Sequence, residues 1–192
     1  MPELPEVETT VRGLARFLDG ARIDRVVLNR PDLRRPFPDD LVQVMTGATV
    51  TSLSRRAKYG LLHTDRDQTM IFHLGMSGRW RIDPAEPDKH DHLIIESGDH
   101  QFALCDPRRF GSVDLVASDA LGEWGPFAAL GPEPLGDDLS SAYLKAALKA
   151  WIRDEKIEPG EWVIGWGYDD TGIEDMRHPF KEDLDEVSTE HP

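Results

Sequence analysis

Cysteine is nearly absent from this sequence, which has one, Cys105, in 192 residues. A single thiol excludes an internal disulfide and a zinc site built from several cysteines. Cys105 ends a short run in which Phe102 and Leu104 alternate with other residues. This pattern is typical of a strand with one buried face, so we expect Cys105 to be a buried structural residue.

Long hydrophobic runs are also missing, so we expect no transmembrane segment. The amino terminus is acidic where a secretion signal would be basic, and this favours a cytoplasmic protein. The hydrophobic content of 39% is enough for a core, and the length suits one domain, or one domain with an appendage.

Basic residues are scarce relative to acidic ones: 22 Lys and Arg stand against 36 Asp and Glu, a net charge of −14. The imbalance is uneven, because residues 1–150 hold 18 basic and 23 acidic residues, whereas residues 151–192 hold 4 and 13. Local basic runs remain at 30–35, 55–58 and 108–109. The charge therefore argues against nucleic acid as a simple ligand but does not exclude a local DNA-binding face.

The amino terminus combines a proline with two nearby carboxylates. Met1 precedes Pro2, a small residue of the kind that usually permits removal of the initiator methionine. The mature chain would then begin with a secondary amine, and an α-amino group has a pKa of about 8, so much of it is unprotonated near neutral pH. With Glu3 and Glu6 within one helical turn, this suits imine chemistry on an aldehyde-like carbon. The alternative is an ordinary helix start, since Pro and Glu both favour the first turn.

Hydrophobic spacing predicts one helix followed by many strands. Apolar residues recur at helical spacing over 5–18, and Gly20 is a plausible stop. The apolar face expected to dock on a sheet consists of Val7, Val11, Leu14, Phe17 and Leu18. Eight short β-like segments follow, separated by turn residues: 23–28, 48–54, 60–64, 69–74, 79–82, 92–96, 101–105 and 112–116. Such a series predicts an antiparallel sandwich or barrel, so the fold class is α+β, mainly β.

Three loops between these segments carry residues suited to DNA contact. Lys58 lies at a sheet edge where it could pair with a phosphate, although alone it reads as a solvated surface lysine. The run His73–Gly78 makes a tight turn that exposes Met76, a wedge for the hole left by a flipped base or simply an apolar strand end. His73 could equally be a satisfied strand histidine.

The loop Asp106–Gly111 carries two arginines and Phe110 between a proline and a glycine. It is either an ordinary connection or an intercalating loop, with Phe110 stacked on a base and an arginine donating to a base edge. His90-Asp91-His92 superficially suggests a metal site, but the alternating apolar residues that follow favour a strand start, and we assign no metal.

The octapeptide Pro2–Thr9 closely resembles the amino terminus of the formamidopyrimidine-DNA glycosylase family, and the three loop motifs match that family too. The resemblance covers roughly residues 1–150. It implies a two-sheet antiparallel β-sandwich with an amino-terminal helix, which excises oxidised purines such as 8-oxoguanine and formamidopyrimidines from double-stranded DNA and nicks the strand by β- and δ-elimination. It implies no cofactor for this chemistry and a protein that works as a monomer in the bacterial cytoplasm.

Roles for eight residues follow from the resemblance. It implies that Pro2 attacks C1′ as the nucleophile, that Glu3 is the general acid and that Glu6 supports proton transfer. Lys58 and His73 would lie near the backbone phosphates. Met76, Arg109 and Phe110 would fill the stack and read the orphaned base.

The resemblance ends after Ala150, where the family continues into a helix–two-turn–helix element and a zinc finger with four cysteines. We therefore expect a catalytic domain over 1–135, the start of a helical domain over 136–150, where Ser140 could cap a helix through Lys149, and an acidic tail over 151–192. In the tail, 161–168 could form one strand, and composition favours disorder from 181 on. Two alternatives to an active enzyme stay open: a truncated or rearranged inactive relative, and a regulatory protein whose acidic tail mimics DNA.

Overall fold

The computed structural model of the chain describes residues 2–134 and 136–154. The chain divides after Leu139 into two units, Met1–Leu139 and Ser140–Pro192. No helix among the described residues is long and apolar enough to cross a membrane.

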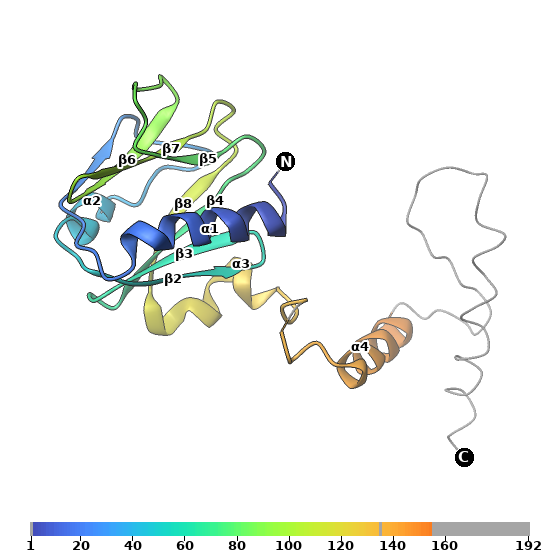
Figure 1. Cartoon of the computed structure of the whole chain (residues 1–192). Coiled ribbons are helices and arrows are strands. Elements are labelled where there is room, and N and C mark those ends of the chain that lie inside the picture. The colour runs from blue at the N-terminus through green and yellow to red at the C-terminus, as the bar shows by residue number, and fades with distance from the viewer. Residues whose placement is uncertain (1, 135, 155–192) are drawn as a thin grey trace, which may run out of the picture. The chain divides into compact units, whose positions relative to one another are not determined.

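The first unit begins with the helix α1, Leu4–Leu18 (Figure 1). Val7, Val11, Leu14 and Leu18 are all buried, because their spacing puts them on one helical face. This face packs against the strands that follow and fixes the start of the helix relative to the sheets. Phe17 differs from expectation: it remains 39% exposed, with its ring against His100 and Phe102.

In the described part of the first unit, eight antiparallel strands form two four-stranded sheets, which confirms the predicted sandwich. One sheet has the order β1-β6-β7-β5 and the other β2-β3-β4-β8. The strands are β1 Arg25–Leu28, β2 Val50–Arg56, β3 Tyr59–Thr64, β4 Gln68–His73, β5 Arg79–Ile82, β6 Asp91–Ser97, β7 His100–Cys105 and β8 Ser112–Ala117. Each coincides with a predicted segment to within two residues at either end, and Cys105 is buried at the end of β7 as expected.

The core lies between the two sheets and α1. Phe72 on β4 and Phe102 on β7 are fully buried there, and the Phe72 ring lies directly over Gly60 on β3. A Cβ atom at Gly60 would lie 2.1 Å from the tip of that ring, so only glycine lets the ring pack this closely.

Three short helices were not predicted. The helix α2, Leu41–Met45, inserts Leu41 and Met45 into the core. The 3-10 helix η1, Ser118–Glu123, and α3, Gly125–Ala128, bring Phe127 against the outer face of the second sheet. Strands β3 and β4 are consequently covered on both faces, which explains their nearly continuous apolar runs.

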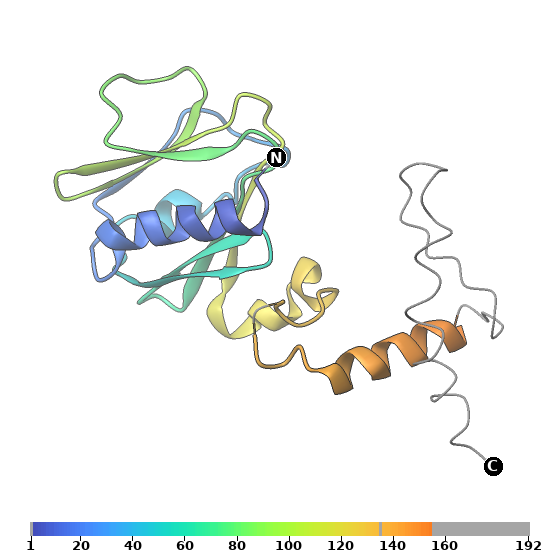
Figure 2. The same cartoon turned by 45° about the vertical axis from the view of Figure 1, so that its right-hand side comes forward.

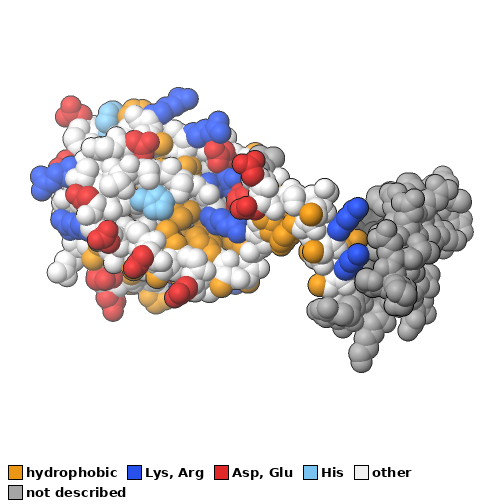
Figure 3. Space-filling model, turned by 90° about the horizontal axis from the view of Figure 1, so that it is seen from below, with side chains coloured by type: hydrophobic (Ala, Val, Ile, Leu, Met, Phe, Trp, Pro, Cys, Tyr) orange, Lys and Arg blue, Asp and Glu red, His pale blue; other side chains and the backbone are white. Residues whose placement is uncertain are grey.

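In the second unit the described residues form the helix α4, Ser141–Asp154. Ser140 caps it as expected, with its Oγ accepting from the Tyr143 amide at 3.1 Å. Its large apolar side chains Tyr143, Leu144, Leu148 and Trp151 are exposed, and Figure 3 shows hydrophobic and basic side chains together on the described part of this unit. The predicted strand at 161–168 and the predicted disorder from 181 on lie outside the described residues.

Candidate active site

The predicted site residues all lie at one edge of the sandwich, which is formed by the ends of several strands and not by an edge strand. Strand registers show this, because Tyr59 at the start of β3 pairs with His73 at the end of β4, which in turn pairs with Ser112 at the start of β8. In the other sheet, Arg79 at the start of β5 pairs with Cys105 at the end of β7. The loops 57–58, 74–78 and 106–111 therefore leave the sheets at the same edge, and the start of α1 lies at this end in Figures 1 and 2.

Pro2 and Glu3 lie just before α1, where a backbone bond fixes them. The Glu3 amide donates to Glu6 Oε2 at 3.0 Å, which satisfies one of the free amides at the helix start. The Glu3 carboxylate forms an ion pair with Lys58 Nζ. Glu6 thus holds the backbone beside Pro2, while Glu3 brings the Lys58 ammonium group to the same place.

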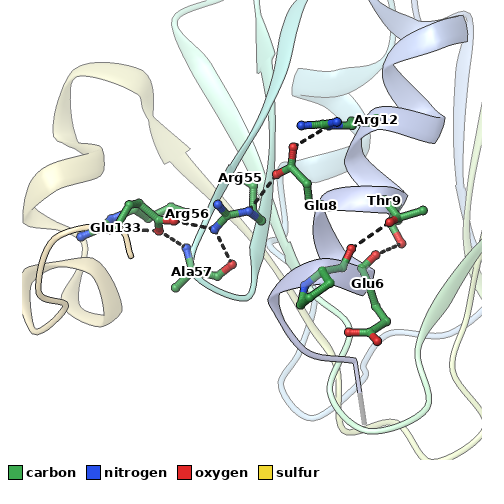
Figure 4. A network of polar contacts seen from close by, with 10 residues as sticks. Glu6, Glu8, Thr9, Arg12, Arg55, Arg56, Ala57 and Glu133 are labelled. Carbon is green, nitrogen blue, oxygen red and sulfur yellow. Dashed lines mark hydrogen bonds and ion pairs between the residues drawn. The ribbon is translucent and has the colours of Figure 1, made fainter. Parts of the chain in front are cut away.

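Lys58 lies on a tight turn that a distant glutamate holds. Ala57 has a left-handed backbone, with φ of 50°, and its amide donates to Glu133 Oε1 at 2.5 Å. Glu133 also accepts from Arg55 at 2.7 Å and from Arg56 at 3.0 Å (Figure 4). Burial by itself raises the pKa of the Glu133 carboxyl, but these three donors outweigh it and hold that pKa below its usual value.

The same network reaches α1. Arg55 Nε donates to Glu8 Oε2 at 2.9 Å, and Arg12 donates to the other Glu8 oxygen at 2.7 Å (Figure 4). The hydrogen bonds from these two arginines lower the pKa of the Glu8 carboxyl, and the bond from Arg55 has the larger effect. The helix that follows Pro2 and the turn that carries Lys58 are therefore joined through Arg55.

His73 is half-buried at the end of β4, with its ring 4.9 Å from that of Tyr59. Its Nδ1 accepts from the Gly75 amide at 3.1 Å, so the hydrogen of the neutral ring is on Nε2. Burial is the main cause that lowers the pKa of His73, and the nearby charges of Lys58, Arg34 and Arg35 lower it further. A neutral Nε2–H beside three cations suits an anion better than a metal ion.

Met76 and Phe110 are exposed at the tips of adjoining loops, at 41% and 44%. A Cβ atom at Gly75 would lie only 2.4 Å from the carbonyl carbon of Phe110, so the two loop backbones are in contact. The Arg108 guanidinium lies 4.7 Å from the centre of the Phe110 ring, a cation–π contact that orients the ring.

Arg109 has an unusual backbone and a weak ion pair. Its φ is 56°, and its Nη1 lies 3.6 Å from Asp32 Oδ1. The same carboxylate oxygen lies 3.4 Å from Arg30 Nη2. Asp32 thus adds a fourth loop, between β1 and α2, to the edge that carries the predicted site.

Sequence reasoning missed Asp32, Glu133 and Asp106. Glu133 and its partner Arg55 are 78 residues apart, and no local pattern reports such a pair. Asp106 lies in the 106–111 loop that the sequence singled out, but its role in holding that loop could not be predicted. That role depends on its complete burial, which only the fold shows.

No group of three or more His, Cys, Asp and Glu that could hold a metal occurs among the described residues. The family's zinc finger needs four cysteines, and this sequence has one, so the residues present do not fit that site.

Comparison with known proteins identifies the family. Residues 1–113 match the model of the formamidopyrimidine-DNA glycosylase N-terminal domain. The formamidopyrimidine-DNA glycosylase of Erythrobacter litoralis is 76% identical over 148 residues, covering 77% of this chain and 55% of that protein. The corresponding protein of Novosphingobium aromaticivorans is 62% identical over 168 residues, covering 83% and 62%.

A solved structure has the same fold. The crystal structure of Lactococcus lactis formamidopyrimidine-DNA glycosylase, bound non-covalently to DNA with an abasic site, aligns with a TM-score of 0.70 at 32% identity. The alignment covers 78% of this chain and 58% of that one. The chain thus spans a little over half the length of these relatives. Its sequence and fold show that it belongs to the formamidopyrimidine-DNA glycosylase family, of which it carries the N-terminal domain.

Proposed function

We propose that this chain acts in DNA repair by excising oxidised purines from duplex DNA and cutting the strand through an imine on Pro2. The observation that carries the proposal is the Glu3–Lys58 ion pair beside Pro2, at the edge where Met76 and Phe110 are exposed. Pro2, Glu3, Lys58 and Met76, which we propose as nucleophile, acid, cation and wedge, lie at one end of the domain, and this supports the proposal. The abasic-site DNA bound by the Lactococcus lactis relative supports DNA as the partner.

The chemistry begins at the Pro2 nitrogen after Met1 has been removed. This secondary amine attacks C1′ of the damaged nucleotide, and the glycosidic bond breaks, so the base leaves with the bonding electrons and takes up the proton that the Pro2 nitrogen loses. Glu3 protonates the sugar ring oxygen as the C1′–O4′ bond opens, leaving an iminium between Pro2 and C1′.

Strand cutting follows from the iminium as an electron sink. Loss of a proton from C2′ expels the 3′ phosphate by β-elimination, and a second elimination, with loss of the C4′ proton, expels the 5′ phosphate. Water then hydrolyses the imine and releases Pro2. Lys58 and the Nε2–H of neutral His73 are the donors that would hold the two phosphates in line.

Access to C1′ requires the damaged nucleotide to leave the stack. Met76 would enter the resulting gap, Phe110 would stack beside it, and Arg109 would leave Asp32 to donate to the orphaned base. The long Arg109–Asp32 contact, at 3.6 Å between exposed groups, costs little to break.

Borohydride trapping tests the proposal. Sodium borohydride reduces an iminium to a stable amine, so incubation with duplex DNA that contains an abasic site should give a covalent adduct on a denaturing gel. We expect Pro2→Gly to reduce the adduct strongly and Lys58→Ala to reduce it, while Lys89→Ala, which removes an exposed lysine, leaves it unchanged. Intact mass should show the loss of Met1.

Two results would contradict the proposal. An adduct of full yield in Pro2→Gly would move the nucleophile to a lysine. A folded wild-type chain that has lost Met1 and gives no adduct would support the alternative of an inactive relative.

A further inference from the structure

Asp106 is a fully buried carboxylate at the base of the Phe110 loop, and no ion pair among the described residues neutralises it. A buried carboxylate without a cation is costly unless hydrogen bonds satisfy it. Its Oδ1 accepts from Ser77 Oγ at 2.7 Å, and its Oδ2 accepts from the Gly111 amide at 2.8 Å. The two donors belong to the two different loops that carry Met76 and Phe110.

Ser77 extends this connection to the other side of the Phe110 loop. While its hydroxyl donates to Asp106, its oxygen accepts from the Arg108 amide at 3.2 Å. The amides on both sides of Arg109 and Phe110 are therefore held, Arg108 through Ser77 and Gly111 directly by Asp106. Both carboxylate oxygens must accept, so an asparagine could supply only one of the two bonds.

The Asp106 backbone is fixed in turn from β6. Its amide donates to the His90 carbonyl at 3.0 Å, and His92 Nε2 donates to its carbonyl at 3.0 Å. His92 is itself buried, so it cannot follow a moving loop without unpacking. Asp106 is thus a rigid base from which both loops are held.

We propose that Asp106 and Ser77 are positioning residues that set the placement of Met76 relative to Phe110, and through it the extrusion of the damaged nucleotide. The inference rests on the proposed function, because only a base-flipping enzyme needs this placement. The loops touch through backbone atoms at Gly75, and a shift of either would move both tips together.

Two substrates separate positioning from folding. A duplex with 8-oxoguanine opposite cytosine needs extrusion before attack, whereas an abasic site in single-stranded DNA presents C1′ without it. We expect Ser77→Ala to slow trapping on the duplex about tenfold, the effect of losing one hydrogen bond to a charged group. The rate of trapping on the single-stranded abasic site should stay within about twofold of the wild-type rate, because this substrate needs no extrusion. Ser77→Thr, which keeps the hydroxyl, should restore the duplex rate.

Ser97→Ala is the matched control, since Ser97, which is buried, donates from its Oγ as Ser77 does, here to the Arg22 carbonyl at 2.7 Å. It should leave the ratio of the two rates unchanged. Asp106→Asn should resemble Ser77→Ala on the duplex if it folds. Equal slowing on both substrates, or a Ser77→Ala rate on the duplex equal to wild type, would overturn the inference.

Amide hydrogen exchange keeps the inference testable if the wild-type chain traps neither substrate, a result that would end the proposed function alone. Exchange over 106–111 should then be faster in Ser77→Ala than in wild type or Ser97→Ala. Unchanged exchange in that segment would overturn the inference without reference to activity.

Discussion

Individual side chains at the sandwich edge are held by backbone groups as much as by each other. Glu6 accepts from the Glu3 amide, His73 from the Gly75 amide and Asp106 from the Gly111 amide. Each bond both satisfies a free amide and fixes a side chain beside the predicted site. A substitution at this edge of the sandwich therefore has two effects to distinguish: the loss of a contact to DNA and a change in the shape of the loop. A control variant is needed to tell them apart.

Phe110→Ala tests a residue that makes few contacts within the chain. Because the ring is 44% exposed, its loss should change the stability little, but it should weaken binding to a lesion duplex by about 1–3 kcal/mol, the value of a stacked base. Fluorescence anisotropy at fixed salt measures this. Phe17→Ala, which removes a comparably exposed ring against His100, should leave the affinity unchanged. Equal affinity losses in both variants would argue against stacking by Phe110.

His73 predicts a pH dependence of stability. Its pKa is lowered in the folded state, chiefly by burial, so below pH 6.5 the unfolded chain takes up a proton that folded His73 resists. The free energy of unfolding should consequently fall as the pH drops from 7 toward 5. Urea unfolding of His73→Gln should show a shallower fall.

Burial also lowers the pKa of His63, so a variant with both histidines replaced should have the flattest profile of the three. A His73→Gln profile parallel to that of the wild type would mean that the ring titrates alike in the folded and unfolded states.

At the scale of elements, helical spacing was enough to predict α1, and short apolar segments separated by turn residues were enough to predict the eight strands of the described residues. The short helices could not be predicted from the sequence, because α2 has five residues and α3 has four, too few to show a helical period. Phe17 is 39% exposed although the helical spacing places it with the buried residues of α1, and its neighbour Leu18 is fully buried. The motif loops could be placed at one edge only through strand pairing, which a single sequence does not reveal.

Glu133 connects the segment after α3 to the β2–β3 turn through its hydrogen bonds. Glu133→Gln removes the charge and leaves one acceptor for Ala57, Arg55 and Arg56. We expect the free energy of unfolding to fall by about 1–3 kcal/mol, as for loss of hydrogen bonds to a charged group. Denaturant unfolding measures it, with Glu123→Gln, an exposed glutamate, as the control.

The loss should shrink in acid, because the lowered pKa of Glu133 means that its contribution is present above the ordinary value of 4.5 and disappears as the pH falls through the folded value. A Glu133→Gln variant as stable as Glu123→Gln at pH 7 would show that the network contributes nothing net.

The whole molecule carries a net charge of −14, yet its predicted DNA-contacting edge gathers Lys58, Arg34, Arg35, Arg108 and Arg109. Residues 155–192 hold 3 Lys and Arg against 12 Asp and Glu, a net of −9. These acidic residues repel DNA over the Debye length, which is about 30 Å at 0.01 M salt and about 3 Å at 1 M.

A chain ending at residue 154 should therefore bind duplex DNA more tightly than the whole chain at low salt, and the difference should vanish as salt rises. A salt titration of both chains measures it. Binding curves that coincide at every salt concentration would show that residues 155–192 do not affect DNA binding. They would contradict the hypothesis that these acidic residues mimic DNA.

The central claim is that the Pro2 nitrogen bonds to C1′ of the damaged nucleotide. Its most direct test is to trap the wild-type chain with borohydride on abasic duplex DNA, digest the adduct and locate the sugar remnant by tandem mass spectrometry. We expect the added mass on the peptide that begins at Pro2, on its amino-terminal nitrogen. A remnant on Lys58 or on any other lysine, with the Pro2 peptide unmodified, would contradict it.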